Sequence, residues 1–451
     1  MKPTQPILII GAGLVGTLWA IFLARRGYDV QVYERRSDMR EAGFAGGRSI
    51  NLAMSHRGWR ALEKAGIKDA IAETAIPMYG RMMHSTSGEL TFQPYGKEGQ
   101  AIYSVSRGGL NLELLRLAER FPNVTLHFDQ RCRRIDLEHN EAHFVHTHSG
   151  AETALQAPLI FGADGAFSAV RSALQKTTGF NYSQQYLEYG YKELNIPPQP
   201  DGAHRMDKNA LHIWPRGNFM LIALPNVDGS FTGTLFLPYA GSAHSFEALS
   251  TEAQQRAFFE REFPDVLPLM PNFADDFQQN PTGALVTIRC NPWHYRQRVL
   301  LLGDAAHAIV PFYGQGMNAG FEDCTLLDAL IDQYSGDWPQ IIESFNQTRI
   351  PDANAIADLA LQNFVEMRDL VSDSQFLLRK KIEQHLAEQH PDRFLPAYSM
   401  VTFSHLPYRK ALAEVHAQDR LFEQILALPG IEQNWQHNPA LEALALDRLR
   451  D

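Results

Sequence analysis

The stretch that decides the fold is ILIIGAGLVG, residues 7–16. Its four leading apolar residues end at a glycine cluster, which is typical of a buried parallel strand. Residues 14–26 follow as a predicted helix that Gly27 ends, and residues 29–33 predict the next strand. This β-α-β order predicts an α/β fold with a doubly wound sheet.

The glycines in this stretch have the spacing GxGxxG. Gly11 permits a tight turn, Gly13 lets the backbone approach a pyrophosphate, and Gly16 allows close packing of helix on strand. The free N–H groups and partial positive charge of the helix start suit phosphates. Glu34 closes the second strand, 18 residues after Gly16, where a carboxylate binds ribose hydroxyls and disfavours a 2′-phosphate. The pattern favours the adenosine of FAD or NAD over that of NADP; the alternative is a glycine-rich turn without a ligand.

Two later segments each lead from an apolar strand into an aspartate. Residues 159–165, LIFGADG, contain Asp164, and residues 299–307, VLLLGDAAH, contain Asp304. Ligands of doubly wound sheets bind at the carboxyl ends of the strands, where both aspartates are expected. Taken singly, either aspartate has a second interpretation as an Asx turn or a helix cap.

A glycine-rich segment follows the second aspartate. In PFYGQGMN, residues 311–318, glycines let the backbone approach a planar ring, and the next helix starts at this point. A loop that Gly314 and Gly316 merely shape is the alternative. His307 is interpreted as a structural histidine, since alanines surround it just after a strand; a general base is the alternative.

In order, the GxGxxG, Asp-Gly and Gly-Asp motifs resemble those of the flavoprotein aromatic hydroxylases. The resemblance implies bound FAD with Asp304 hydrogen-bonded to the ribityl chain. It also implies that Arg107, in SVSR at residues 104–107, reaches the cofactor. Asp164 would lie near both the flavin and the nicotinamide coenzyme.

Three places are candidates for binding a substrate. Arg81 and Tyr95 stand 14 residues apart around a hairpin-like turn, and Arg81 lies among methionines, where a guanidinium needs an anionic partner. A substrate carboxylate would satisfy it, and an internal salt bridge is the alternative. Asn363 falls on an apolar helical stripe with Glu366 at its edge, which is also compatible with a structural network between helices. Tyr398 is a candidate pocket wall.

Four further segments are more specific than the flavin motifs: GRSINLA at 47–53, YKEL at 191–194, ALHIWP at 210–215 and MVTFS at 400–404. With them, the chain from residue 7 to about 408 resembles the kynurenine 3-monooxygenase family. This resemblance implies that Arg81 and Tyr95 bind the substrate carboxylate, and that Asn363 and Tyr398 complete the site with Glu366 beside them. The apolar wall would comprise Leu211, Met220, Ile222, Leu224, Phe236, Pro311 and Phe312. The positions that match FAD contacts are Gly11, Gly13, Val15, Gly16, Tyr33, Glu34, Arg35, Arg36, Ala53, Arg107, Asp164, Asp304, Gly316, Met317 and Asn318.

The activity that this resemblance implies is hydroxylation of L-kynurenine to 3-hydroxykynurenine in tryptophan catabolism. FAD is the cofactor, NADPH and O2 are co-substrates, and oxygen transfer proceeds via a flavin C4a-hydroperoxide. No side chain is assigned as a catalytic acid or base. The alternatives are a flavin-dependent hydroxylase of another aromatic acid and a flavin-binding protein without turnover.

Composition limits the remaining possibilities. Among 451 residues there are 41 basic and 51 acidic side chains, a formal net charge of -10, which argues against a nucleic-acid partner. Three scattered cysteines suggest neither a metal site nor disulfides, so reduced thiols and a cytoplasmic location are expected. No run of 18 apolar residues is present, so no membrane anchor is expected. Whether the chain forms a homodimer is left open.

Changes in pattern along the chain predict three parts. Residues 1–75, 100–180 and 290–345 would form the FAD-binding domain. Residues 76–99 and 181–289 would form a substrate domain of mainly antiparallel sheet, inserted into the first. Residues 346–451 would form a C-terminal helical region that closes the substrate pocket.

Overall fold

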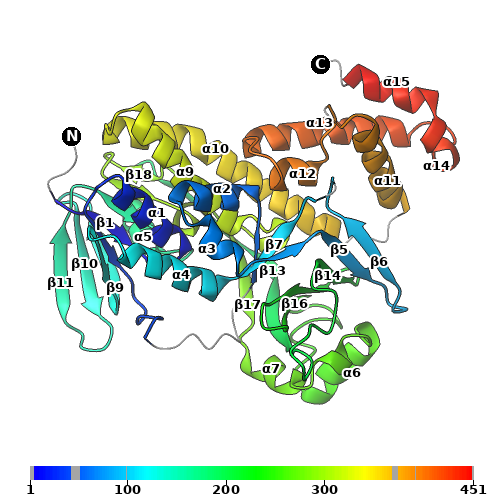
Figure 1. The fold of residues 1–451 in the computed structure, drawn as a ribbon, viewed down its shortest axis with the longest axis horizontal. Coiled ribbons are helices and arrows are strands. Elements are labelled where there is room, and N and C mark those ends of the chain that lie inside the picture. Colours follow the sequence, from blue (N-terminus) through cyan, green and yellow to red (C-terminus); the bar gives the residue numbers. More distant parts are fainter. Residues whose placement is uncertain (1–4, 42–50, 98, 368–373, 392, 449–451) are drawn as a thin grey trace.

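A computed structural model describes residues 5–41, 51–97, 99–367, 374–391 and 393–448. Residues 47–50 of the GRSINLA segment lie outside this described part. Figure 1 shows the two ends of the chain on opposite sides of the molecule, with the C-terminal helices gathered at one end.

The first layer is a six-stranded sheet in the order β18-β19-β12-β1-β2-β8. Neighbouring strands are parallel except for β18 and β19, and all four residues of β1 are buried. The doubly wound α/β fold is therefore confirmed. The strands are β1 (Ile7–Ile10), β2 (Val30–Tyr33), β8 (Val124–His127), β12 (Ile160–Gly162), β18 (His294–Tyr295) and β19 (Val299–Leu301).

The helix after β1 is buried along nearly its whole length. In α1 (Leu14–Arg25) every residue from Gly16 to Ala24 is buried, because the helix is covered by both α4 and α9. The other helices of this part are α2 (His56–Ala65), α3 (Lys68–Ala72), α4 (Arg107–Glu119), α5 (Ala169–Leu174), α8 (Asp304–His307) and α9 (Gly316–Gln333).

A second, seven-stranded sheet has the order β17-β13-β16-β15-β14-β5-β6. Its pairs are antiparallel except β14 with β5, whose parallel register places Leu211 opposite Arg81. A phenylalanine-rich core packs between this sheet and its α6–α7 segment. The elements are β5 (Gly80–His84), β6 (Leu90–Pro94), β13 (Asn181–Ile196), β14 (Ala210–Pro215), β15 (Met220–Pro225), β16 (Phe231–Pro238), α6 (Glu252–Glu262), η1 (Leu267–Leu269), α7 (Phe273–Gln279) and β17 (Gly283–Asn291).

Two three-stranded sheets complete the strand inventory of the described residues. One has the order β3-β7-β4, and the other, which the sequence analysis did not anticipate, has the order β11-β10-β9. Their strands are β3 (Asn51–Met54), β4 (Ile76–Met78), β7 (Ile102–Ser106), β9 (Gln130–Asp136), β10 (Glu141–His146) and β11 (Glu152–Gln156).

The C-terminal part is helical in the residues that are described. In Figure 1, α10 (Trp338–Val365) extends from beside α9 toward this part. The apolar stripe predicted around Asn363 begins on α10, which ends at Val365, just before Glu366. The other helices are α11 (Ser374–Gln389), α12 (Ala397–Thr402), α13 (Tyr408–Leu426), α14 (Ile431–Asn434) and α15 (Pro439–Arg448).

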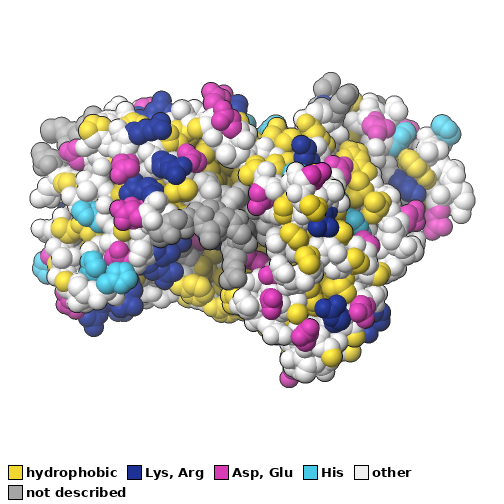
Figure 2. All heavy atoms as spheres, turned by 60° about the horizontal axis from the view of Figure 1, so that its bottom comes forward, with side chains coloured by type: hydrophobic (Ala, Val, Ile, Leu, Met, Phe, Trp, Pro, Cys, Tyr) yellow, Lys and Arg dark blue, Asp and Glu magenta, His cyan; other side chains and the backbone are white. Residues whose placement is uncertain are grey.

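Two global features bear on possible partners. No helix of the described residues is long and apolar enough to cross a membrane. On the face that Figure 2 shows, basic and acidic side chains are interspersed, unlike the continuous basic footprint of a nucleic-acid-binding surface.

Candidate active site

The glycine loop after β1 combines two tightly packed positions with one open position. Gly11 has φ +102°, and an added Cβ would lie 2.5 Å from the carbonyl oxygen of Ala163. At Gly16 a Cβ would lie 2.0 Å from the Gly11 carbonyl oxygen. Gly13 is the N-cap of α1, and a Cβ there would meet no atom within 4 Å. Packing within the protein therefore explains two of the glycines, whereas the third leaves space in front of the helix N-terminus.

Glu34 lies beside this loop as a buried anion. Its Oε2 accepts a hydrogen bond from the Ala12 N–H at 2.9 Å, and its Oε1 accepts from the backbone and Nε of Arg36. Burial by itself would raise the pKa of Glu34, but the hydrogen bonds and charge of Arg36 and the Ala12 N–H hold it below its usual range. Each carboxylate oxygen can accept two hydrogen bonds, so Oε2 keeps one position for a ribose hydroxyl.

The other predicted contacts next to Glu34 divide between core and surface. Tyr33 packs between the rings of His127 and Phe144, with centroid distances of 4.3 and 4.2 Å. Arg35 and Arg36 are exposed. Tyr33 thus supports the strand from the core side, while Arg36 fixes the Glu34 carboxylate.

The two aspartates at the sheet edge differ in how far the protein satisfies them. Asp164 Oδ2 accepts hydrogen bonds from the N–H groups of Ala169 and Val170, so it caps α5, while its Oδ1 is buried without a partner among the described residues. Burial raises the pKa of Asp164. Asp304 starts α8 and has no hydrogen-bond or ion-pair partner in the described part of the chain. Both are available for a ligand, and the cap interpretation of Asp164 is correct as well.

The side chain of Asn318 is fully engaged within the protein. Its Oδ1 accepts from the Ser55 N–H at 2.9 Å, and its Nδ2 donates to the carbonyls of Ala53 and Gly314 at 2.8 Å each. These bonds hold the glycine segment against β3. A ligand contact made by the donors of this segment would therefore come from the backbone at the start of α9, where Gly316 and buried Met317 lie.

Val15 joins the glycine loop to the second aspartate motif, because its side chain fills the space beside Gly303 and Gly320. Arg107 starts α4 and is exposed, and its positive charge offsets part of the rise in pKa that burial imposes on Tyr191 and Glu193. Arg107 therefore faces the YKEL strand.

Asn111 was missed by the sequence analysis. It is buried one helical turn after Arg107, its Nδ2 donates to the Ala12 carbonyl at 3.2 Å, and its Oδ1 has no partner among the described residues. The i, i+4 spacing from Arg107 is the signal that would have indicated it.

Arg81 is the clearest ligand-binding candidate of the second sheet. Its Nε is buried without a hydrogen-bond partner, and no carboxylate of the described residues lies within ion-pair distance. Its guanidinium carbon lies 4.8 Å from the ring centroid of Tyr398 and 5.6 Å from that of Tyr95. The Tyr95 hydroxyl is also buried and unpaired. The internal salt bridge that the sequence left open is absent from this part of the structure, and a buried cation beside an unpaired hydroxyl is suited to an anionic ligand.

Three tyrosines stack next to this cation. The Tyr95 and Tyr398 rings lie 5.0 Å apart with 12° between their planes, and Tyr398 and Tyr313 lie 5.6 Å apart with 13° between theirs. Burial raises the pKa of all three hydroxyls, so they remain neutral donors. Because Tyr313 directly precedes Gly314, the stack connects Arg81 to the glycine segment. Tyr313 was not among the site residues predicted from the sequence.

The two polar residues predicted on the apolar helical stripe, Asn363 and Glu366, have different partners. Asn363 is buried, its Nδ2 donates to the Phe312 carbonyl at 2.7 Å, and its Oδ1 accepts from no described residue. Glu366 instead lies 3.8 Å from Lys380 of α11. The structure brings Asn363 to the stack through η2 (Pro311–Tyr313). Glu366 pairs with Lys380, and after burial its negative charge is the next cause of the raised pKa of Tyr313, so its carboxylate acts on the stack as well.

Most of the predicted apolar wall is brought together. Met220, Phe236 and Phe312 belong to one buried cluster and Leu224 to a second, which also contains Tyr95. The clusters meet where Ile222 and Tyr398 pack against both, and Leu211 packs against the second. Pro311 differs, because it is exposed at the start of η2.

A buried charged network behind α9 was not foreseen from the sequence. Glu322 accepts from Arg57 and from Arg349, and Asp323 accepts from Arg349, from His307 and from the Gly303 N–H. Arg57 also donates to the carbonyls of Val401 and Leu406, which flank the end of α12. His307 is structural, as expected, and the network ties the Gly-Asp turn to the segment that carries Tyr398. The adjacent acids Glu322 and Asp323, between the apolar residues Phe321 and Cys324 of α9, are the signal that sequence reasoning missed.

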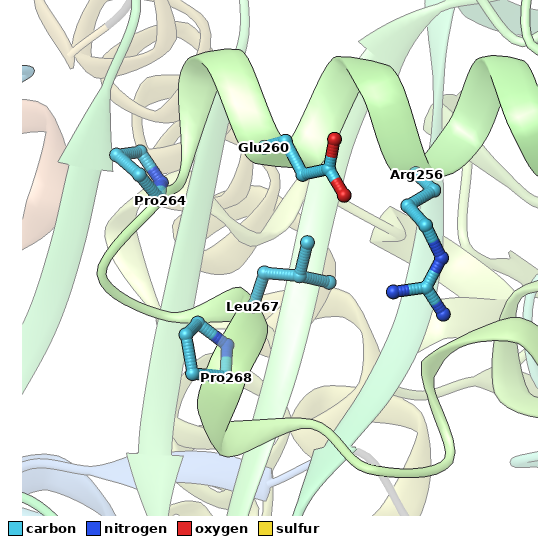
Figure 3. A pocket seen from close by; sticks show the side chains of 5 residues that line it. All are labelled: Arg256, Glu260, Pro264, Leu267 and Pro268. Carbon is cyan, nitrogen blue, oxygen red and sulfur yellow. The ribbon is translucent and has the colours of Figure 1, made fainter.

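A surface hollow of about 310 Å³ lies elsewhere, along α6 and η1. Figure 3 shows its lining residues, none of which is a predicted site residue: Arg256, Glu260, Pro264, Leu267 and Pro268. The position of this hollow gives no support to a substrate site there.

Comparison with known proteins defines the class first. The family described as FAD binding domain matches residues 4–360, a range that contains the glycine loop, both aspartates and the whole second sheet. The chain is thus a flavoprotein monooxygenase of α/β fold with FAD as cofactor. Kynurenine 3-monooxygenases of Christiangramia forsetii and Flavobacterium johnsoniae are each 48% identical to it, over 98% and 100% of this chain and 99% and 100% of theirs. That of Sus scrofa is 45% identical over 94% of this chain and 89% of its own. The chain belongs to the kynurenine 3-monooxygenase family.

Solved structures support the fold alone. A tetrameric 2-methyl-3-hydroxypyridine-5-carboxylic acid oxygenase superposes with a TM-score of 0.67 at 19% identity, over 85% of this chain and 97% of its own. The p-nitrophenol 4-monooxygenase of Pseudomonas putida gives a TM-score of 0.64 at 18% identity, over 93% and 98%.

Proposed function

We propose that the chain hydroxylates L-kynurenine to 3-hydroxykynurenine, with FAD as cofactor and NADPH and O2 as co-substrates. Full-length similarity to kynurenine 3-monooxygenases supports this assignment. The single observation that carries it is Arg81: a half-buried side chain whose Nε is buried and unpaired, beside the unpaired hydroxyl of Tyr95. An amino-acid carboxylate supplies the anion that this pair lacks.

In the proposed complex, each substrate group meets a side chain with free hydrogen-bonding capacity. Arg81 binds the carboxylate by its guanidinium fork, and Tyr95 donates its hydroxyl proton to the same group. Asn363 Oδ1 accepts from the substrate amino group, because its Nδ2 is held by the Phe312 carbonyl. The two apolar clusters pack on the aromatic ring and exclude water from it. The protein thus contributes by orienting the substrate and by excluding water from its aromatic ring.

The residues around the glycine loop fit FAD. The open space at Gly13, the remaining acceptor position of Glu34 and the unpaired Asp304 would hold its pyrophosphate, adenosine ribose and ribityl chain, with Arg107 and Asp164 alongside. When bound, FAD supplies the redox chemistry that uses NADPH and O2 to place one oxygen atom on an aromatic ring. The aryl amine of kynurenine enriches its ortho carbon in electrons. A binding mode that fixes this carbon therefore selects the 3-position without a catalytic acid or base.

Two further aspects belong to the proposal. We propose that the discontinuous FAD-binding domain, the inserted substrate domain and the C-terminal helical region have the boundaries predicted from the sequence. Three free cysteines, two of them buried, support a cytoplasmic location.

The test is a coupled measurement of NADPH oxidation and product mass. With L-kynurenine, NADPH oxidation should accelerate and the product should gain one oxygen atom. A flavin-dependent hydroxylase of another aromatic acid would respond to that acid instead, for example a hydroxybenzoate. A flavin-binding protein without turnover would be yellow yet oxidise no NADPH with any aromatic amine.

A further inference from the structure

Two buried histidines contact each other on the strand pair that carries Arg81. His84 ends β5, and His212 lies on the neighbouring β14; the His84 Nε2 and His212 Nδ1 atoms are 2.9 Å apart. The outer nitrogens are also engaged, since His84 Nδ1 lies 2.8 Å from Asp265 Oδ2 and His212 Nε2 lies 2.8 Å from the Asp207 carbonyl. The two side chains form one continuous chain of hydrogen bonds between two acceptors.

The number of protons on the two rings determines the charge of the histidine pair. The Asp207 carbonyl and an ionised Asp265 only accept hydrogen bonds, so each outer nitrogen must carry a proton. The central contact needs a third proton, because two ring lone pairs would otherwise face each other at 2.9 Å. Two neutral imidazoles carry only two protons between them. The pair therefore shares one additional proton and forms an ion pair with Asp265.

The surroundings indicate where that charge lies. His84 is the ring that contacts the Asp265 carboxylate, whereas burial lowers the pKa of His212 to about 4, so Coulombic attraction favours the additional charge on the ring beside Asp265. Burial by itself would raise the pKa of Asp265, but the hydrogen bonds from His84 and Trp214 have the larger combined effect and lower this pKa below its usual value. Asp265 is therefore ionised. The other charged groups next to the pair are Asp207 and Arg216, whose Nη1 donates to the His84 carbonyl at 3.0 Å. Glu262 lies beyond them, because the charge of its carboxylate acts on Arg216 and its carbonyl accepts from Arg216 Nε.

The location of this chain connects it to the substrate site. Side chains alternate along a strand, so His84 and Arg81, three residues apart on β5, point to opposite faces of the sheet. The register places Met82 opposite His212 and Arg81 opposite Leu211. The third member, Asp265, comes from the segment between Pro264 and Leu267, which Figure 3 shows beside α6. The hydrogen bonds thus hold β5 on the face of the sheet opposite to the face from which Arg81 projects.

We propose that His84, His212 and Asp265 form a positioning unit, sharing one additional proton, that holds β5 in the place from which Arg81 meets the substrate carboxylate. The inference rests on the proposed function for its kinetic consequence. The shared proton is a property of the protein alone. None of the three residues contacts the reacting atoms in this proposal, so each acts through Arg81.

The first test counts the ring protons. Nitrogen-15 spectra of the histidines are recorded on the FAD-loaded enzyme at pH 7, and the signals are assigned with the variants His84→Gln and His212→Gln. The two rings should show three N–H groups, two on His84 and one on His212. Two N–H groups in total would overturn the shared proton. This measurement needs no turnover, so it stands even if L-kynurenine is not the substrate.

The second test separates positioning from a merely structural role. Asp265→Asn removes the charge that balances the imidazolium and should raise the KM for L-kynurenine about fivefold, with kcat within about twofold and FAD content unchanged. Asp265→Glu should restore part of the loss. His244→Gln, at a half-buried histidine of the same domain, is the matched control and should leave the KM unchanged. If Asp265→Asn shifts only stability, positioning is overturned. If the Asp265→Asn variant does not fold, the dependence of the wild-type KM for L-kynurenine on pH is the deciding measurement. The KM should rise with increasing pH as the shared proton is lost, and a KM that does not change with pH overturns the proposal.

Discussion

The cofactor end and the substrate end of this molecule are built in different ways. At the proposed cofactor end, the glycine loop and Glu34 come from one short stretch of chain and are joined by the hydrogen bond from the Ala12 N–H to Glu34, although Arg107, Asp164 and Asp304 are added from later segments. At the substrate end, the cation Arg81 comes from β5 and its neighbouring rings come from the β6–β7 connection, η2 and α12. The first is a property of local backbone geometry, whereas the second exists only when distant segments pack together.

The two ends also differ in what holds them. Cβ positions that would collide with backbone fix Gly11 and Gly16. The substrate end depends on Arg57, which binds carbonyls on both sides of α12's end, and on Glu322, which holds Arg57. Changes can therefore be chosen that affect one end, the other, or both.

The largest effect is expected where the two ends are joined. Glu322→Gln leaves the guanidiniums of Arg57 and Arg349 without their shared carboxylate, and a broken buried pair costs about 3 kcal/mol. Urea unfolding should show this loss, with weaker binding of FAD and L-kynurenine together. The control Glu119→Gln removes an exposed partner of Arg40 and should change stability by less than about 0.5 kcal/mol. Equal stability of the two variants would contradict the role of the network.

A change at Arg81 should affect the substrate end alone. Arg81→Gln should weaken L-kynurenine binding about 100-fold, since a charge-assisted bidentate contact is lost, while the FAD content stays that of the wild type. Arg81→Lys keeps the charge without the fork and should fall between the two. Titration of the flavin absorbance with L-kynurenine measures this, and wild-type affinity in Arg81→Gln would refute the carboxylate assignment.

A change at Gly13 should affect the cofactor end alone. Gly13→Ala adds a methyl group into open space at an ordinary backbone conformation, so stability should not change, yet FAD should bind about tenfold more weakly because the pyrophosphate loses its close approach. Titration of the apoprotein with FAD gives the affinity.

Gly16→Ala is the contrasting variant, since its Cβ would lie 2.0 Å from a carbonyl oxygen, and it should fail to fold. A Gly13→Ala enzyme that binds FAD as the wild type does would show that nothing approaches this position.

A smaller effect is expected at Asn363. Asn363→Ala removes one acceptor for the substrate amino group and the bond to the Phe312 carbonyl, which should weaken L-kynurenine binding about fivefold. Gln362→Ala, at the exposed neighbour on α10, is the control and should be neutral. Identical Kd values for the two variants would remove Asn363 from the site.

The smallest expected effect is one of pH. The pKa values of Tyr95, Tyr313 and Tyr398 are raised by burial, so their hydroxyls keep their protons as pH rises past the ordinary tyrosine range. An acid whose pKa is raised stays neutral to higher pH, so these groups should not change the Kd of L-kynurenine between pH 6.5 and 8.5. A Kd that weakens steeply within this window, and no longer does so in Tyr95→Phe, would show that Tyr95 ionises there.

Sequence reasoning reached the cofactor end more completely than the substrate end. The strand, the glycine turn, the helix and the acid were readable because each depends on residues a few positions apart. Asn111 and Asn318 show the limit: the first was not noticed, and the second was assigned a ligand contact although its carboxamide is engaged by Ser55, Ala53 and Gly314. Ala12 lies 99 residues before Asn111, and Ser55 and Ala53 lie 263 and 265 residues before Asn318, so these bonds cannot be inferred from spacing.

By itself, then, the sequence determined the doubly wound sheet, the dinucleotide loop and the family. Backbone geometry at glycines and the spacing of apolar residues depend on short segments of the chain, so they can be inferred from the sequence. Only the tertiary structure decided that Arg81 has no protein carboxylate within the described residues, that Tyr313 joins the stack, that Glu366 pairs with Lys380, and that His84 and His212 touch. The physical reason is that charge pairing and ring stacking act through space over a few ångströms, whichever segments of the chain supply the groups.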